Sequence, residues 1–228
     1  MSDPRTSDWL TPAALVALSV VPVVAGAFRL IQLGAGVEIT EDNARFFAAP
    51  IPVVIHIVSS VIFCLLGAFQ FSGTLRRLRL GWHRNAGRIL VASGIASALS
   101  GLWMTQFYPT SEFDGSGFLY AIRLLAGSAM AVFLVLGLIA IHRRDVPSHQ
   151  AWMMRSYALG LAAGTQVLTH LPWFVFPSMH GELARTLSMA AGWAINLVVT
   201  EWFILRRLQI AQRVIATGRD AHAQVHRT

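Results

Sequence analysis

Two histidines, His83 and His149, stand beside arginines at the starts of two apolar segments. Arg84 and Arg88 are four residues apart and share one helix face, while Arg155 follows His149 on the second segment. Imidazole nitrogens bind haem iron, and guanidinium groups pair with anionic propionates. The spacing therefore predicts a site for an anionic cofactor, with b-type haem as the leading candidate and the two histidines as its axial ligands.

A second pair of histidines, His56 and His170, lies at another depth of the apolar region. His56 begins a semi-polar stripe that continues, at helical spacing, through Ser60, Phe63, Gly67 and Gln70. An imidazole at such a depth serves either as a hydrogen-bonding group between helices or as a cofactor ligand, and the sequence leaves both open. If His56 binds a ligand, a quinone is the molecule that we expect.

The composition indicates that membrane-spanning helices position these groups. Hydrophobic residues make up 55% of the 228 residues and charged residues only 13%, whereas a soluble domain carries roughly 25% charge. A helix crosses the hydrocarbon core with about 20 apolar residues. Six runs meet this requirement, at 12–33, 50–71, 86–107, 118–141, 151–171 and 185–205. The predicted fold is an all-α, six-transmembrane-helix bundle, one integral membrane domain over 1–228 with a basic tail at 206–228.

The arginines predict the orientation of this bundle. Six spans put both termini on one side of the membrane, which we call side B, and fourteen of the eighteen arginines fall there. Side A, the opposite side, holds the other four, which are Arg29, Arg45, Arg123 and Arg185. Arginine-rich loops face the cytoplasm, so we expect cytoplasmic termini and a multi-pass protein of the bacterial cytoplasmic (inner) membrane. The long apolar first span favours retention over cleavage as a signal peptide.

Spans two to five form the predicted four-helix bundle that would host the haem. Spans three and five are diagonal in such a bundle, so His83 and His149 would face each other across the ring. His56 and His170 lie on adjacent spans, which is a less favourable geometry. Glu201 is the single carboxylate within the six runs, and we expect it to pair with Arg155 or another side-B arginine.

The arginines also have an explanation that needs no cofactor. Membrane topology and contacts with anionic lipids account for a basic collar at the helix ends, and the histidines would then only pack between helices. Nucleic-acid binding is not expected, because the arginines follow the helix ends. The single cysteine, Cys64, excludes a disulfide framework, and the chain contains no HExxH zinc motif.

Three segments carry a resemblance to a known family: HIVSSVIFCLLGAFQF, WHRNAGRILVASGIASALSGLW and HRRDVPSHQAWMMRSYAL. In order and spacing they resemble the bacterial predicted membrane protein family known as domain-of-unknown-function family 2306. The resemblance implies a multi-pass membrane protein without an established activity. Its motif positions are His56, His83, Arg84, Arg88, His149, Trp152 and Arg155.

The chain is also loosely similar to the cytochrome b561 group, in which histidines on successive spans bind two haems. Its fourth span lacks an interior histidine, so we expect one haem at most.

Two hypotheses of function follow from these observations. In the first, the protein is a membrane electron-transfer module that binds one b-type haem through His83 and His149, with a quinone or another redox partner. In the second, it is a non-redox membrane protein, either a small transporter subunit or a scaffold for anionic lipids. Neither hypothesis requires the chain to be an enzyme on its own.

Overall fold

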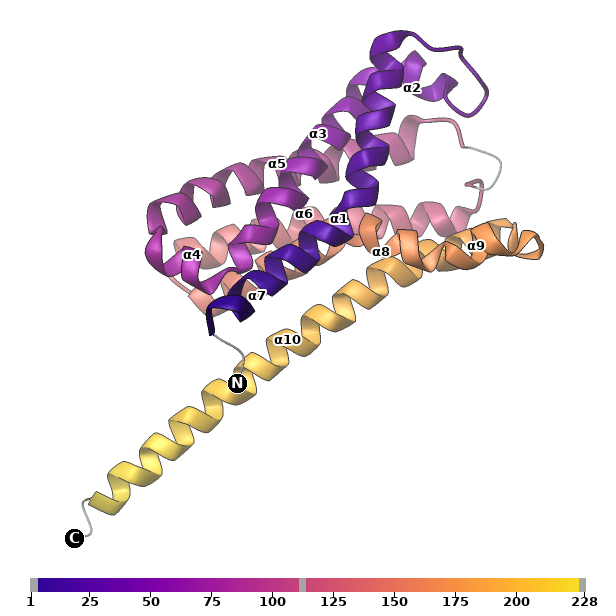
Figure 1. The fold of residues 1–228 in the computed structure, drawn as a ribbon. Coiled ribbons are helices and arrows are strands. Elements are labelled where there is room, and N and C mark those ends of the chain that lie inside the picture. The colour runs from indigo at the N-terminus through magenta and orange to yellow at the C-terminus, as the bar shows by residue number, and fades with distance from the viewer. Residues whose placement is uncertain (1–3, 111–113, 226–228) are drawn as a thin grey trace.

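The structure is a computed structural model that describes residues 4–110 and 114–225. All regular elements among these residues are helical (Figure 1). The α-helices are α1 (Pro4–Ala35), α2 (Ala44–Ala48), α3 (Pro50–Ala68), α4 (Gly73–Leu78), α5 (Leu80–Phe107), α6 (Gly117–His142), α7 (Val146–Gly160), α8 (Ala162–Thr169), α9 (Leu171–Val175) and α10 (Glu182–Val225). Two 3-10 turns, η1 (Phe69–Phe71) and η2 (Pro177–Met179), complete the described elements.

Five of the described helices are long and apolar enough to cross a membrane. The spans are Trp9–Ala35, Pro50–Phe71, Leu80–Phe107, Gly117–His142 and Glu182–Ile210. They confirm the prediction of a multi-pass, all-helical membrane protein. The run expected at 151–171 is divided between α7 and α8, which meet at Leu161. The count of six spans and the cytoplasmic termini therefore stay predictions.

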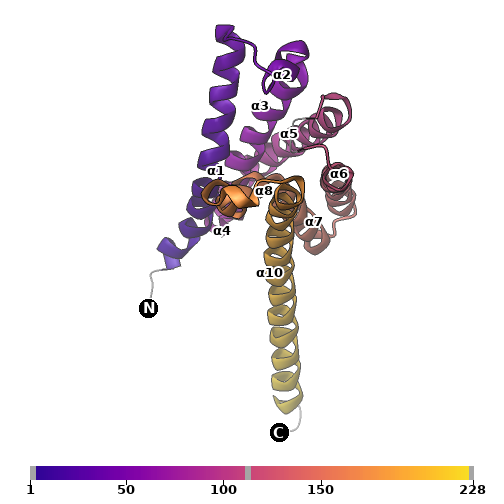
Figure 2. The ribbon, with the colours of Figure 1, turned by 90° about the vertical axis from the view of Figure 1, so that its right-hand side faces the viewer.

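Four elements enclose the core of the bundle. Helix α3 packs on α5, α5 on α6, α6 on α7, and α7 returns to α3, while α1 and α10 lie outside them along α8 (Figure 2). Phe63, Leu134 and Tyr157 belong to the buried cluster at the centre. Gly94 is required there, because a Cβ atom at this position would lie 2.7 Å from the Phe63 ring and 2.8 Å from Leu134.

The break between α7 and α8 is held by side chains of other helices. Gly164 N–H bonds to Leu161 O rather than to the carbonyl one residue earlier, which belongs to Gly160. Gly160 O instead accepts from the Cys64 thiol at 3.5 Å, and Asn196 Nδ2 of α10 donates to Ala158 O at 2.9 Å. A buried carbonyl that has no partner is costly, so these side chains make the break tolerable.

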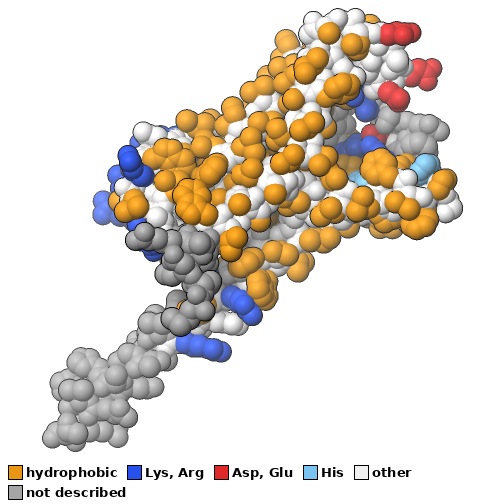
Figure 3. All heavy atoms as spheres, in the orientation of Figure 1, with side chains coloured by type: hydrophobic (Ala, Val, Ile, Leu, Met, Phe, Trp, Pro, Cys, Tyr) orange, Lys and Arg blue, Asp and Glu red, His pale blue; other side chains and the backbone are white. Residues whose placement is uncertain are grey.

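The surface separates apolar from charged regions. Figure 3 shows hydrophobic side chains over most of the visible face of the bundle, as expected for a surface in contact with lipid. Basic side chains gather at the end where α4 lies, and acidic side chains gather at the opposite end, beside α2. The start of α1 and the end of α10 lie toward the basic end, beyond which α10 projects (Figure 1). This arrangement is compatible with the predicted sides A and B.

Removing the amide of Asn196 should destabilise the break between α7 and α8. In Asn196→Ala, Ala158 O loses its donor and the Thr165 hydroxyl loses its acceptor, Asn196 Oδ1, at 2.7 Å. We expect a loss of about 1–3 kcal/mol in the free energy of unfolding, measured by denaturant titration in mixed micelles. Asn85→Ala, at an exposed position of α5, is the matched control. Equal stability of the two variants would contradict this account of the break.

Candidate functional site

A cavity of about 490 Å³ lies among α1, α3, α5, α6 and the pair α7–α8. Its walls are largely apolar, and its size falls within the range of small-molecule sites, roughly 300–1,000 Å³. Exposed Pro109 and Thr110, which follow α5, form part of its rim. The cavity therefore reaches the end of the bundle opposite α4, which is side A. The polar or ionisable side chains on its walls include Ser19, Arg45, His56, Ser60, Cys64, Ser97, Thr105, Tyr108, Asp114, Arg123 and Gln166.

His56 lies in the wall of this cavity with its ring fixed by α5. Its Nδ1 is 2.9 Å from Ser97 O and 3.3 Å from Ser100 Oγ. Since a carbonyl oxygen only accepts, Nδ1 carries the hydrogen and Nε2 is the acceptor of the neutral ring. Gly101 leaves room for the ring, because a Cβ atom there would lie 3.2 Å from His56 Cε1. The site thus offers a fixed hydrogen-bond acceptor at membrane depth.

The semi-polar stripe predicted on the second span divides between two roles. His56 and Ser60 line the cavity, where the Ser60 and Ser97 hydroxyls lie 2.6 Å apart. Phe63 and Gly67 instead pack in the core, against α7. The helical spacing therefore identified the face of α3 that points into the bundle, but only the first half of the stripe lines the cavity.

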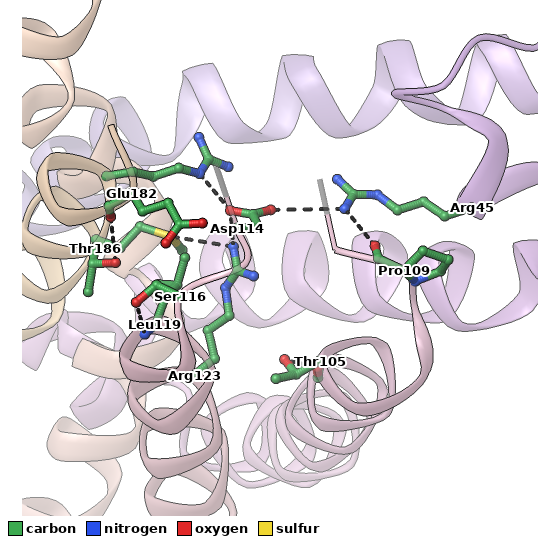
Figure 4. Close-up of polar contacts among 12 residues, drawn as sticks. Arg45, Thr105, Pro109, Asp114, Ser116, Leu119, Arg123, Glu182 and Thr186 are labelled. Atoms are coloured by element: carbon green, nitrogen blue, oxygen red, sulfur yellow. Dashed lines mark hydrogen bonds and ion pairs between the residues drawn. The ribbon is translucent and has the colours of Figure 1, made fainter. Parts of the chain in front are cut away.

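Three arginines from three helices surround one carboxylate at the outer end of the cavity (Figure 4). Arg185 Nε donates to Asp114 Oδ1 at 2.6 Å and Arg123 Nη2 donates to the same oxygen at 3.1 Å. Arg45 Nη1 lies 3.9 Å from Asp114 Oδ2. The Asp114 side chain is only 4% exposed. We call Arg45, Asp114, Arg123 and Arg185 the mouth cluster.

The predicted topology puts Arg45, Arg123 and Arg185 on side A but does not connect them. Asp114 was not a candidate, because it lies in a turn between two predicted spans and no spacing rule links it to an arginine on another helix. The sequence feature that could have pointed to the mouth cluster is the distribution of the arginines. Membrane topology does not explain basic residues on side A, because arginines tend to lie on the cytoplasmic side. The four arginines on side A therefore need a different explanation, such as a binding or structural role.

His83 and His149 lie at side B, and neither lines the cavity described above. They are close enough to interact electrostatically. His149 Nδ1 lies 2.8 Å from Gly137 O, which leaves Nε2 as its free nitrogen. His83 Nδ1 is buried without a hydrogen-bond partner in the described part of the chain. The structure thus brings the two predicted ligands into one region without fixing an axial geometry.

The arginines expected beside a cofactor have other surroundings. Arg84 and Arg88 are exposed, and Arg88 Nη1 donates to Asn85 Oδ1 at 3.3 Å. Arg155 binds Glu201 through two hydrogen bonds, Nε to Oε1 at 2.5 Å and Nη2 to Oε2 at 2.8 Å. The Arg155 guanidinium also lies 4.6 Å from the centre of the Trp152 ring. The expected pairing of Glu201 with Arg155 is confirmed, and it joins α7 to α10.

His170 is not brought into the cavity. Its Nδ1 is 2.7 Å from Gln166 O, one turn earlier on its own helix. Within residues 4–110 and 114–225, no group of three or more His, Cys, Asp and Glu side chains could hold a metal ion. A haem needs fewer protein ligands than this, so its assignment to His83 and His149 stays a prediction.

A family model described as "Predicted membrane protein (DUF2306)" matches residues 53–204. The chain belongs to this family. The DUF2306 match runs from α3 into α10 and so includes His56, Asp114, Arg123 and Arg185, while α1 and Arg45 precede it. No curated protein and no solved structure matches the chain.

The Arg155–Glu201 pair should contribute to the docking of α10. Arg155→Glu and Glu201→Arg should each lower the melting temperature, because each leaves like charges where the pair was. Combining the two restores opposite charges, so the double variant should be more stable than either single variant. We expect a coupling energy of about 1 kcal/mol in a double-mutant cycle, since both side chains are partly exposed. Additive effects would show that the pair contributes nothing to stability.

Proposed function

We propose that this protein is a membrane-embedded binding protein of the carrier type, which takes a small amphipathic molecule into its cavity from side A. The observation that carries the proposal is the broken helix α7–α8. Its interruption at Gly160–Leu161 and the neighbouring Ala163 and Gly164 form part of the cavity wall. The proposal develops the non-redox hypothesis drawn from the sequence.

Irregular backbone at membrane depth is tolerated where it is buried in protein or lines a cavity. Discontinuous helices are typical of the substrate sites of membrane transporters. In this chain the break faces the cavity on one side and is hydrogen-bonded to Asn196 on the other. A ligand in the cavity would therefore contact the interruption between α7 and α8 directly.

The cavity walls suggest the kind of molecule that binds. Apolar side chains and small residues line most of it, which suits a hydrocarbon body, and Nε2 of His56 can accept a hydrogen bond from a ligand. A ligand whose apolar body carries a hydroxyl group meets both conditions, since the hydroxyl can donate to His56, whereas a quinone has only acceptor oxygens. The quinone expected from the sequence stays a prediction, and only its reduced form could donate to His56.

The proposed setting is the bacterial cytoplasmic membrane, with α7–α8 counted as one broken span and both termini in the cytoplasm. The basic end near α4 supports this orientation, because basic loops face the cytoplasm. Side A and the mouth of the cavity would then face outward. Anionic lipids of the inner leaflet would contact the arginines of α4 and the start of α5.

Filling the cavity should remove bound molecules. In Ser60→Leu the larger side chain occupies space next to Ser97, whereas Ser128→Leu makes the same change at an exposed position of α6. Native mass spectrometry of protein purified in mild detergent should show a co-purifying small molecule on the wild type and on Ser128→Leu, but not on Ser60→Leu. Equal occupancy of the two variants would contradict binding in this cavity.

Haem binding at His83 and His149 is the second candidate function. Two observations favour it: the buried His83 Nδ1 without a partner in the described residues, and the bond that orients the His149 ring. A histidine that ligates a metal commonly bonds a carbonyl through its other nitrogen. Arg155 would be less available to a propionate, because its Nε and Nη2 already donate to Glu201.

A difference spectrum tests this second candidate. After expression with ample haem, the reduced-minus-oxidised spectrum should contain an α-band near about 560 nm, the region of b-type haem. His149→Ala should remove the band, while His142→Ala, an exposed histidine near the same side of the bundle, should keep it. A flat spectrum from wild-type protein would exclude a b-type haem.

A further inference from the structure

We infer that the mouth cluster is an anion site, and that the ligand of the cavity carries an oxyanion head group, a carboxylate or a phosphate. This inference rests on the proposed function, because it specifies the head group of the molecule that the cavity binds. Its starting point is a charge imbalance. Three guanidinium groups converge on one carboxylate, so these four side chains carry two positive charges in excess.

Among the residues that the structure describes, no carboxylate other than Asp114 forms an ion pair with Arg45, Arg123 or Arg185. Glu182 begins α10, and its Oε1 lies close to Gly115. It is exposed, and even if its charge is counted, one positive charge remains. Arg29 adds to the positive side, since its guanidinium and that of Arg45 lie 4.6 Å and 4.9 Å from the centre of the Phe46 ring.

All four side-A arginines therefore gather at one place. They come from α1, α2, α6 and α10, which are distant in the sequence. Arginines scattered as lipid anchors would have no reason to converge, and their mutual repulsion opposes convergence. A bound anion supplies the missing charge. Arginine is well suited to this role, because its planar donors match the oxygens of a carboxylate or phosphate.

Hydrogen-bonding capacity remains unused in the cluster. Arg45 Nη1 donates to Pro109 O at 3.2 Å, but its buried Nε has no partner among the described residues. Arg123 Nη2 reaches Met189 Sδ at 3.5 Å, and a thioether sulfur is a weak acceptor. An oxyanion between Arg45 and Arg123 would be a stronger acceptor for these donors.

The position of the cluster relative to the cavity defines the orientation of the ligand. Arg45, Asp114 and Arg123 belong to the cavity wall, whereas Cys64 and Gly160 belong to the same wall further along α3 and α7. Cys64 lies eight residues beyond His56, or roughly 12 Å along the helix. The anionic head would therefore stay at side A while the apolar body extends toward the break between α7 and α8.

Asp114 has a specific role in this arrangement. In the absence of ligand it supplies the one buried carboxylate that the three arginines share. A ligand oxyanion would compete with Asp114 for the same guanidinium groups. Removal of the Asp114 charge should therefore tighten anion binding, while removal of an arginine charge should weaken it. These opposite changes in anion affinity distinguish an anion site from an ion-pair network that only stabilises the fold.

The test compares four probes that share one apolar tail: decanoate, decyl phosphate, decanol and decylamine. Binding is measured at equilibrium on protein in nanodiscs of zwitterionic phosphatidylcholine, with empty nanodiscs subtracted. We expect decanoate or decyl phosphate to bind roughly ten- to hundredfold more tightly than decanol, as one or two charge-assisted hydrogen bonds would give. Decylamine should bind most weakly. The tighter of the two anions identifies the head group.

Variants of the mouth cluster then show where the anionic head group binds. Arg45→Gln and Arg123→Gln should reduce anion affinity to that of decanol, and Asp114→Asn should raise it. Arg143→Gln removes the same charge from an exposed position at the opposite end of the bundle and should change nothing. Unchanged decanol binding in each variant shows that the cavity is still folded.

Three results would overturn the inference, and they separate it from the proposed function. If decanol binds as tightly as the anions and Ser60→Leu abolishes its binding, the cavity binds a ligand but the anion site is wrong. If Arg143→Gln weakens anion binding as much as Arg123→Gln, the preference is a general surface effect. If none of the probes binds the wild type, both the inference and the proposed function fail.

Discussion

Backbone carbonyls that lose their helical donors need other partners, and this requirement shapes the centre of the structure. Helix α7 stops at Gly160 and α8 starts at Ala162, so carbonyls near Leu161 lose their usual helical donors. Cys64 and Asn196 replace those donors from α3 and α10. A break that is satisfied in this way can stay in the bundle, and the space beside it becomes part of the cavity wall.

Charged side chains also need partners, and the two ends of the bundle differ in how these partners are supplied. At side B, Arg155 and Glu201 form a matched pair, and most other arginines there are exposed to water or lipid headgroups. At side A, three arginines share a single buried carboxylate. A matched pair needs nothing more, whereas an unmatched cluster favours the binding of an anion. For this reason we place the proposed anion site at side A, although side B holds most of the arginines.

The sequence predicted those features that depend on composition and on helical spacing. Apolar runs identified the five long helices, and the family motifs identified membership of DUF2306. The pairing of Glu201 with Arg155 was also expected, because few partners are available to a carboxylate in the membrane. The mouth cluster was missed because Asp114 meets Arg45, Arg123 and Arg185 only through the packing of separate helices. The break at Leu161 was missed because no proline interrupts 151–171, and its glycines, Gly160 and Gly164, are also common within membrane helices.

Helix α10 connects the features that sequence spacing could not join. Its Arg185 binds Asp114 at the mouth, and its Asn196 binds the carbonyl of Ala158 at the break. Between them Gly192 allows close contact, because a Cβ atom there would lie 2.4 Å from Gln166 Cγ on α8. A ligand that draws the mouth arginines away from Asp114 would therefore act on the same helix that fixes the broken segment. The mouth cluster and the break are thus connected through one continuous helix, which is the arrangement that the proposed carrier function would use.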